Sequence, residues 1–231
     1  MLRSESTEQQ KYSVIIFDVG GVLFHFNEEF YEGEFFEEKY GIPRNKTVAF
    51  FKSEHHSKYE KGIISSEEFF RKLKSALNYP GNYEQFRKDF IKGNNAYKAE
   101  DVWEFFYRLK VKYYGKASFW ILSNLNELLR QHLMEEWPGA FENFIKLFWS
   151  CEMGCMKPEP EIYAKMLAIG EASPCACILI DDREENGECP KKIGMPFIHF
   201  RGLDKLREEL KTIYGFYVED DENTNTNKPR S

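Results

Sequence analysis

The chain lacks several features that mark particular classes of protein. No apolar run approaches the ~20 residues of a membrane-spanning helix, so we expect no membrane partner. The formal net charge of −6 lacks the basic excess of a nucleic-acid-binding protein, so we expect no nucleic-acid partner either. The 5 cysteines show no CxxC pair, which argues against a zinc site. The polar N-terminus is unlike a signal peptide, and with these cysteines it predicts a reduced, cytoplasmic protein.

Short apolar runs that alternate with helical patterns indicate the fold class. We expect buried strands at Val14–Phe17, Ala117–Leu122, Phe144–Trp149, Ala176–Ile180 and Pro196–Phe200. Helical periodicity occupies the segments between and after the later strands, at 101–112, 125–136, 158–169, 184–193 and 203–213. Strands that alternate with helices predict an α/β fold, in which a parallel sheet carries helices on both faces.

The segment after the first strand has a different pattern. We find no convincing strand between about 26 and 110, and helices are expected around 30–38, at 47–59, from Ser65 or Ser66 to about 77, and around 83–90. This pattern predicts a helical cap at 26–105, inserted into a core formed by 12–25 and 106–215. The polar ends, 1–11 and 219–231, are expected to be disordered.

The first strand runs directly into Asp18, and two glycines follow at 20 and 21. The glycines allow a sharp turn and a close approach of the backbone to a ligand. A carboxylate at the carboxyl end of a buried strand lies where open α/β sheets bind their ligands. From this stretch alone, Asp18 is equally compatible with a nucleophile or metal ligand and with a turn-forming residue.

Polar residues also follow the second and fourth predicted strands. Because parallel strands end at one edge of the sheet, we expect these residues to converge with Asp18. Lys157, just before a predicted helix, is able to reach the same edge. The converging set is Asp18, Ser123, Asn124, Lys157, Asp181 and Asp182. Its carboxylates are suitable ligands for Mg²⁺, and its hydroxyl, amide and ammonium groups are suitable donors to phosphate oxygens. One carboxylate in such a set can attack phosphorus.

Four segments in this order resemble the motifs of the haloacid dehalogenase (HAD) superfamily of hydrolases. They are 17–23 (FDVGGVL), 121–124 (ILSN), 156–163 (MKPEPEIY) and 180–182 (IDD). The resemblance covers nearly all of residues 13–213 and implies a Rossmann-like core with a helical cap after the first motif. Segments 59–65 and 181–186 are most similar to the sugar-phosphate phosphatases related to bacterial α-D-glucose-1-phosphate phosphatase.

The resemblance implies a Mg²⁺-dependent phosphatase that hydrolyses a small phosphorylated metabolite through an aspartyl-phosphate intermediate. Asp18 would be the nucleophile and a Mg²⁺ ligand, together with the backbone carbonyl of Gly20 and with Asp181. Asp182 would ligate the metal directly or through water, or would orient Lys157. Ser123 and Asn124 would hold the transferred phosphoryl group. Lys157 would neutralise that group and keep the nucleophile ionised.

One position departs from the pattern of the superfamily. Most of its phosphatases carry a second Asp, a general acid, where this chain has Gly20; related sugar-phosphate phosphatases also have Gly there. Water or a cap residue would then protonate the leaving oxygen. His25 is one candidate, although a surface histidine is the simpler interpretation. A metal-free dehalogenase and a non-catalytic binding module remain alternatives, and the sequence specifies neither substrate nor oligomeric state.

Overall fold

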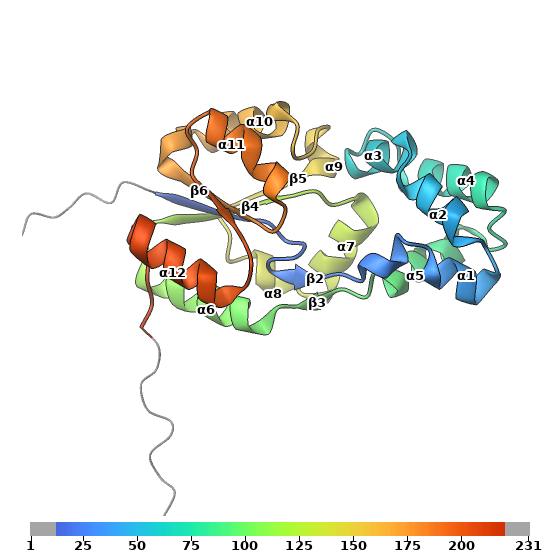
Figure 1. Cartoon of the computed structure of the whole chain (residues 1–231), viewed down its shortest axis with the longest axis horizontal. Helices are drawn as coiled ribbons and strands as arrows, with labels where there is room; N and C mark the ends of the chain where they lie inside the picture. Colours follow the sequence, from blue (N-terminus) through green and yellow to red (C-terminus); the bar gives the residue numbers. More distant parts are fainter. Residues whose placement is uncertain (1–12, 220–231) are drawn as a thin grey trace, which may run out of the picture.

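A parallel sheet forms the centre of the computed structural model, which describes residues 13–219. Its strand order within these residues is β5-β4-β1-β6-β7 (Figure 1). The strands are β1 (Val14–Phe17), β4 (Ser118–Ser123), β5 (Lys146–Trp149), β6 (Cys177–Asp181) and β7 (Phe197–His199). All the neighbouring pairs are parallel, so the predicted α/β class is confirmed. The predicted disordered ends lie outside the described residues, apart from residue 219.

The strands are buried on both faces because helices cover both sides of the sheet. Ile15 and Phe17 of β1 belong to one hydrophobic cluster, and Val14 and Ile16 belong to the other. The helices α10 (Pro160–Gly170) and α11 (Glu188–Lys192) lie on one side, and α6 (Glu100–Lys112) and α12 (Leu203–Tyr214) lie on the opposite side (Figure 1). This arrangement explains why the strands are mainly apolar and do not alternate, with polar residues only at their ends.

The segment before α11 differs from the prediction of one helix over 184–193. A 3₁₀ turn, η3 (Glu184–Gly187), comes first, and α11 begins at Glu188. Pro190 therefore lies in the first turn of α11, where its missing N–H would have no partner within the helix. A further 3₁₀ turn, η2 (Pro174–Ala176), leads into β6.

Helices that follow one another from residue 28 to residue 94 form the inserted part of the chain. They are η1 (Glu28–Phe30), α1 (Glu34–Tyr40), α2 (Arg44–Phe51), α3 (Glu54–Glu60), α4 (Ser66–Leu77) and α5 (Tyr83–Asn94). Phenylalanine and tyrosine side chains fill their shared interior, among them Phe30, Phe69 and Phe90, which are fully buried. The predicted helix over 47–59 is in fact two helices, because Ser53 caps the N-terminus of α3.

A two-stranded antiparallel ribbon connects this insert to the sheet and corrects the expectation of no strand between 26 and 110. It pairs β2 (Phe24–His25) with β3 (Tyr97–Lys98). The predicted boundary at 105/106 falls inside α6, and buried residues of this helix lie on both sides of that point. Trp103 donates a hydrogen bond to the Leu23 carbonyl, and the Phe106 ring contacts Phe17. Contacts of α6 with the core thus begin before residue 105, and the domain boundaries themselves stay a prediction.

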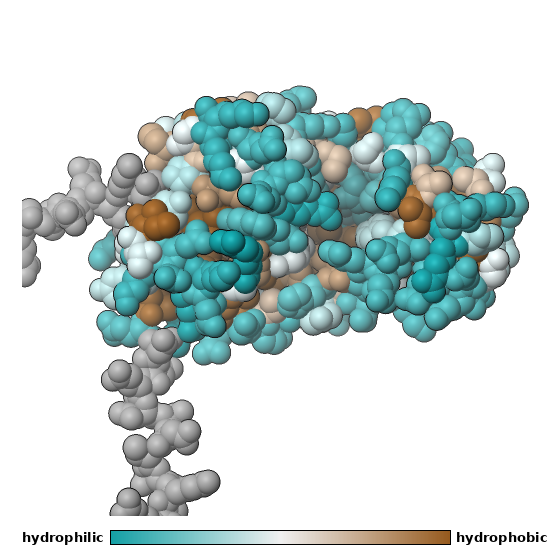
Figure 2. Space-filling model, viewed as in Figure 1, coloured by the Kyte–Doolittle hydropathy of each residue, from teal (hydrophilic) through white to brown (hydrophobic). Residues whose placement is uncertain are grey.

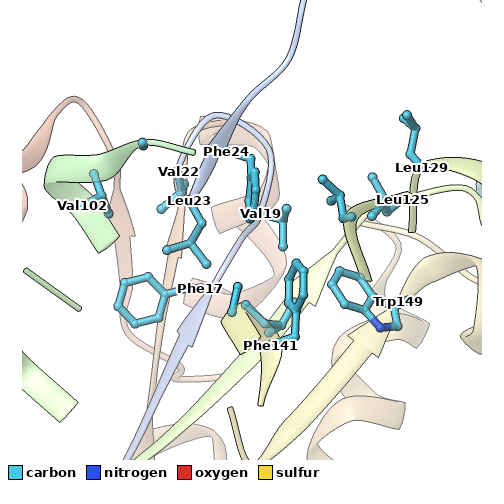
Figure 3. Close-up of a cluster of buried hydrophobic side chains, with 14 of the residues drawn as sticks. Phe17, Val19, Val22, Leu23, Phe24, Val102, Leu125, Leu129, Phe141 and Trp149 are labelled. Carbon is cyan, nitrogen blue, oxygen red and sulfur yellow. The ribbon is translucent and has the colours of Figure 1, made fainter. Parts of the chain in front are cut away.

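A cluster of apolar side chains fixes the carboxyl end of β1. It joins residues after β1 to residues of α6, of α7 (Glu127–Glu136), of α8 (Pro138–Phe141) and of β5 (Figure 3). A short helix, α9 (Ser150–Met153), follows β5 directly.

The outer surface in view is mainly hydrophilic (Figure 2). Within residues 13–219, no helix is both long and apolar enough to cross a membrane.

Candidate active site

The register of the sheet brings the predicted site residues to one edge. Phe17 of β1 is level with Ile121 of β4 and with Ile180 of β6. Asp18, the next residue, donates its backbone N–H to the Ile180 carbonyl at 2.9 Å. Asp18, Ser123 and Asp181 therefore meet at the carboxyl ends of the three central strands, although more than a hundred residues separate the first two in the chain.

Lys157 lies between two of the carboxylates and is almost fully buried. Its Nζ is 3.0 Å from Asp18 Oδ1 and 2.5 Å from Asp181 Oδ2. It also donates a hydrogen bond to the Leu122 carbonyl at 2.9 Å. Burial lowers the pKa of Lys157, but the charges of the two aspartates raise it above its ordinary value. Lys157 is therefore a cation fixed beside the candidate nucleophile.

Asp18 is itself buried, and its Oδ1 accepts a hydrogen bond from the Val19 backbone N–H at 2.7 Å. Burial raises the pKa of Asp18 to about 7, although Lys157 and the Ser123 hydroxyl act to lower it. Lys157 thus favours the ionised form of Asp18, but burial and the neighbouring carboxylates have the larger effect on its pKa. A further positive charge at this edge of the sheet would lower the pKa of Asp18 and favour its ionised form.

Asp181 is held by several donors. Its Oδ1 accepts from the Arg183 backbone N–H at 2.9 Å and from Asn186 Nδ2 at 2.8 Å. Asn186 is buried, and its main-chain carbonyl accepts a hydrogen bond from Tyr163 Oη at 2.7 Å. No role for Asn186 was predicted from the sequence. The sequence feature that could have indicated this hydrogen bond is the spacing: Asn186 follows Asp181 by five residues, across a turn at the end of a strand.

Asp182 lies against the turn that follows β1. A Cβ atom at Gly21 would stand 2.2 Å from Asp182 Oδ2, and Gly21 has a φ of +70°. The positive φ favours glycine at this position, and any side chain there would displace the Asp182 carboxylate. Burial raises the pKa of Asp182 above its ordinary value. The close ion pairs of Lys157 are with Asp18 and Asp181, and the charge of Lys157 also acts on Asp182, where it lowers the pKa.

The three aspartates fit a hard divalent cation. One carboxylate oxygen from each of Asp18, Asp181 and Asp182 lies within 4.8 Å of the others. Oxygen donors at such separations suit Mg²⁺. Three carboxylates and one ammonium leave a net negative charge when all are ionised, and a divalent cation would balance it. Gly20, whose carbonyl is a further predicted ligand, lies in the same turn, two residues after Asp18.

Asn124 reaches this edge, but its side chain is engaged elsewhere. Asn124 Nδ2 donates to the Lys157 carbonyl, and Asn124 Oδ1 accepts from the Lys157 N–H, both at 2.8 Å. This pair of hydrogen bonds fixes the main chain that carries the lysine. Ser123 is buried, and its hydroxyl interacts with Asp18. Of the residues predicted to bind phosphate, Ser123 and Lys157 therefore have side chains that interact with Asp18, whereas the Asn124 side chain binds the main chain of Lys157.

The candidate general acid His25 lies in β2. Its side chain is exposed and packs against Tyr97 with ring centroids 5.0 Å apart. These contacts favour the interpretation as a surface histidine of the ribbon. Gly20 has no positive φ, and a Cβ atom there would make ordinary contact with the Phe26 ring at 3.5 Å.

Sequence relatives include enzymes named for the hydrolysis of phosphorylated compounds. Flavin mononucleotide hydrolase 1 of Arabidopsis thaliana, named as chloroplastic, is 25% identical over 229 residues, which cover 90% of this chain and 80% of that protein. Sesquiterpene phosphatase astK of Aspergillus oryzae is 24% identical over 204 residues, which cover 88% of this chain and 97% of that protein. The compartment of the present chain thus remains a prediction.

Solved structures share the fold at lower identity. A HAD family enzyme from Bacteroides thetaiotaomicron has a TM-score of 0.72 at 22% identity, with 84% of this chain and 96% of that chain covered. The same enzyme was solved with magnesium and inorganic phosphate, with a TM-score of 0.67 at 22% identity and coverage of 81% and 93%. Residues 12–194, most of the chain, match the family described as haloacid dehalogenase-like hydrolase. The chain therefore belongs to the haloacid dehalogenase-like hydrolases.

Proposed function

We propose that this hydrolase is a Mg²⁺-dependent phosphatase that acts on a small phosphorylated metabolite through an aspartyl phosphate on Asp18. The observation that carries the proposal is the position of Asp18 at the centre of the sheet edge. It lies 3.0 Å from the buried Lys157 ammonium and within 4.8 Å of carboxylate oxygens from two further aspartates. A carboxylate with a fixed cation and a divalent-metal set around it is suited to phosphoryl transfer.

In the first step, a carboxylate oxygen of Asp18 attacks phosphorus and forms an O–P bond. The bond from phosphorus to the leaving oxygen breaks, and that oxygen keeps the electron pair and takes up a proton. Water then attacks the phosphorus of the acyl phosphate, which releases inorganic phosphate and restores the Asp18 carboxylate. Lys157 and the Ser123 hydroxyl would bind the oxygens of the transferred group, and Asn124 would keep Lys157 in place.

Asp18, Asp181, Asp182 and the Gly20 carbonyl would hold Mg²⁺. The bound ion would neutralise charge on the phosphoryl group and favour the ionised form of Asp18. The relatives named as a flavin mononucleotide hydrolase and a sesquiterpene phosphatase support this proposal, as does the fold relative solved with magnesium and phosphate. Gly20 supplies no side-chain acid, so a leaving group that needs little protonation, such as an anomeric sugar oxygen, fits best.

Hydrolysis of 4-nitrophenyl phosphate tests the proposal. We expect turnover with Mg²⁺, none with EDTA, and at least a ~10³-fold loss in Asp18→Asn, because the nucleophile is removed. A 2-haloacid assayed in parallel without metal tests the dehalogenase alternative, which the acidic triad disfavours. Halide release that is independent of metal would replace the phosphatase proposal. An Asp18→Asn variant that behaves as wild type in both assays would show that Asp18 is not the nucleophile.

A further inference from the structure

Four consecutive residues, from the last residue of β4 onward, each interact with a different part of the molecule. Ser123 faces the nucleophile, and the Asn124 side chain holds the main chain of Lys157. The Leu125 backbone N–H donates to Ser150 Oγ in α9 at 2.9 Å. Asn126 extends from this segment to the helical insert. The segment 123–126 is therefore a direct physical link between the catalytic edge and the insert.

The partner of Asn126 in the insert is Glu60, the last residue of α3. Asn126 Nδ2 donates to Glu60 Oε1 at 2.7 Å, and Ser150 Oγ donates to the Glu60 main-chain carbonyl at 2.6 Å. Asn126 and Ser150 are both fully buried, and Glu60 is only 8% exposed. His56 Nε2 lies 3.4 Å from Glu60 Oε1 on the same helix. Glu60 thus places a buried carboxylate at the point where the insert contacts the segment 123–126.

The contact between α3 and the core is also close at the backbone level. Gly62, just after α3, lies so near α9 that a Cβ atom would stand 1.9 Å from the Cys151 carbonyl oxygen.

Burying a carboxylate such as that of Glu60 is costly unless hydrogen bonds satisfy it, and an apolar residue would pack at such an interface with less desolvation. A bonded carboxylate instead specifies one position for its partner, here Asn126.

We propose that Glu60 is a positioning residue for the phosphatase reaction: by docking on Asn126 and Ser150, it holds the segment that carries Ser123 and Asn124 in the geometry needed for turnover. The proposal rests on the function proposed above. It assigns the insert a role in catalysis that is separate from substrate selection, because Glu60 acts through the core and does not touch the nucleophile.

The first experiment compares Glu60→Ala with Glu60→Gln. Alanine removes the acceptor for Asn126, whereas glutamine retains an oxygen in that place. With 4-nitrophenyl phosphate, we expect kcat to fall about 10-fold or more in Glu60→Ala, because small displacements of positioning groups have effects of this size. In Glu60→Gln, we expect kcat to stay within about 3-fold of wild type, and KM should change little in either variant.

A matched control separates positioning from loss of stability. Asp89 is a buried carboxylate whose hydrogen-bond partners all lie within the insert: Lys39, Tyr40, Tyr79 and Gln85. Asp89→Asn should therefore lower the melting temperature while kcat stays unchanged at temperatures where the protein is folded. If Glu60→Ala keeps the wild-type kcat, or if Asp89→Asn lowers kcat as much as Glu60→Ala does, the positioning role is wrong.

Exchanging the donor and the acceptor provides a rescue test. Asn126→Asp alone places a second carboxylate against Glu60 and should lower kcat at least as much as Glu60→Ala. The double variant Asn126→Asp/Glu60→Gln restores one donor and one acceptor. The carboxylate introduced at position 126 can still accept from the Leu129 N–H and cap α7, as Asn126 Oδ1 does in wild type. We expect kcat to recover in the double variant. Additive losses would contradict a direct Glu60–Asn126 coupling.

Hydrogen exchange gives a measurement that does not depend on the substrate. In Glu60→Ala, backbone amides of residues 125–129 should exchange faster than in wild type and in Asp89→Asn, while those of β6 should not change. Equal exchange of 125–129 in all three proteins would overturn the proposal. Wild type without phosphatase activity would refute the proposed function, and the exchange experiment would still decide whether Glu60 holds this segment.

Discussion

Introducing an aspartate at position 20 tests whether protonation of the leaving group limits this enzyme. The main chain at Gly20 has no positive φ, so a side chain there causes no backbone strain. Its Cβ atom would lie 3.5 Å from the Phe26 ring, an ordinary van der Waals distance. Gly20→Asp should therefore fold as wild type and place a carboxyl group two residues after the nucleophile.

The expected size of the effect depends on the leaving group. General acid catalysis typically contributes ~10²–10⁴-fold, and we expect about 10²-fold for an alkyl phosphate in Gly20→Asp. A 4-nitrophenyl ester should gain much less, since its leaving group is stable without a proton. The assay is the ratio of kcat/KM for an alkyl phosphate to kcat/KM for 4-nitrophenyl phosphate, measured in wild type and in the variant at one pH.

The neighbouring glycine is the control for this experiment. Gly21→Ala should be inactive or poorly folded, because its φ is +70° and its Cβ atom would stand 2.2 Å from Asp182 Oδ2. Folding is monitored by circular dichroism. A folded Gly20→Asp protein whose alkyl-to-aryl ratio equals that of wild type would show that another group already supplies the proton, and the role inferred for the missing acid would be refuted.

Three further predictions concern charge. Lys157→Met leaves buried carboxylates without their cation, so we expect a loss of about 3–5 kcal/mol in unfolding free energy in EDTA; a loss below about 1 kcal/mol in urea titrations would contradict this. Mg²⁺ should raise the melting temperature of wild type more than that of Asp182→Asn, and equal shifts would argue against a metal site at these aspartates. Burial raises the pKa of Asp89, but its hydrogen bonds have the larger effect and lower the pKa below its ordinary value. The ionised Asp89 therefore contributes fully to the unfolding free energy above about pH 5, and this contribution is lost as the pH falls through the lowered pKa. Asp89→Asn should accordingly cost about 2 kcal/mol at about pH 7, and this cost should shrink below about pH 4 in urea titrations.

The central sheet was predictable from sequence because its strands are buried on both faces. Such strands are continuous apolar runs, and each of the expected runs contains a strand. The convergence of Asp18, Ser123 and Asp181 follows from parallel topology alone. The β2–β3 ribbon was missed because each strand has only two residues, too few for any periodicity.

Other parts of the candidate site depend on contacts that no local pattern encodes. Nothing near Asn124 in the sequence indicates that its amide is bonded to the main chain of Lys157, 33 residues away. The link between Glu60 and Asn126 spans 66 residues. The direction in which Lys157 changes the pKa of Asp18 was predictable, but the larger effect of burial was not, because it depends on the packed structure.

The β2–β3 ribbon has a consequence for how such a protein can be modified. Because His25 and Tyr97 are paired residues of adjacent strands, the chain leaves the core and returns to it at a single point. The Ala99 N–H and the Trp103 indole both donate to the Leu23 carbonyl, so this point is fastened by bonds that lie outside the helical insert. A two-residue turn between His25 and Tyr97 would close the ribbon as a hairpin. An insert can therefore be exchanged at the ribbon without changing the sequences of β1 and β6, but the replacement must again supply an acceptor for Asn126, as Glu60 does.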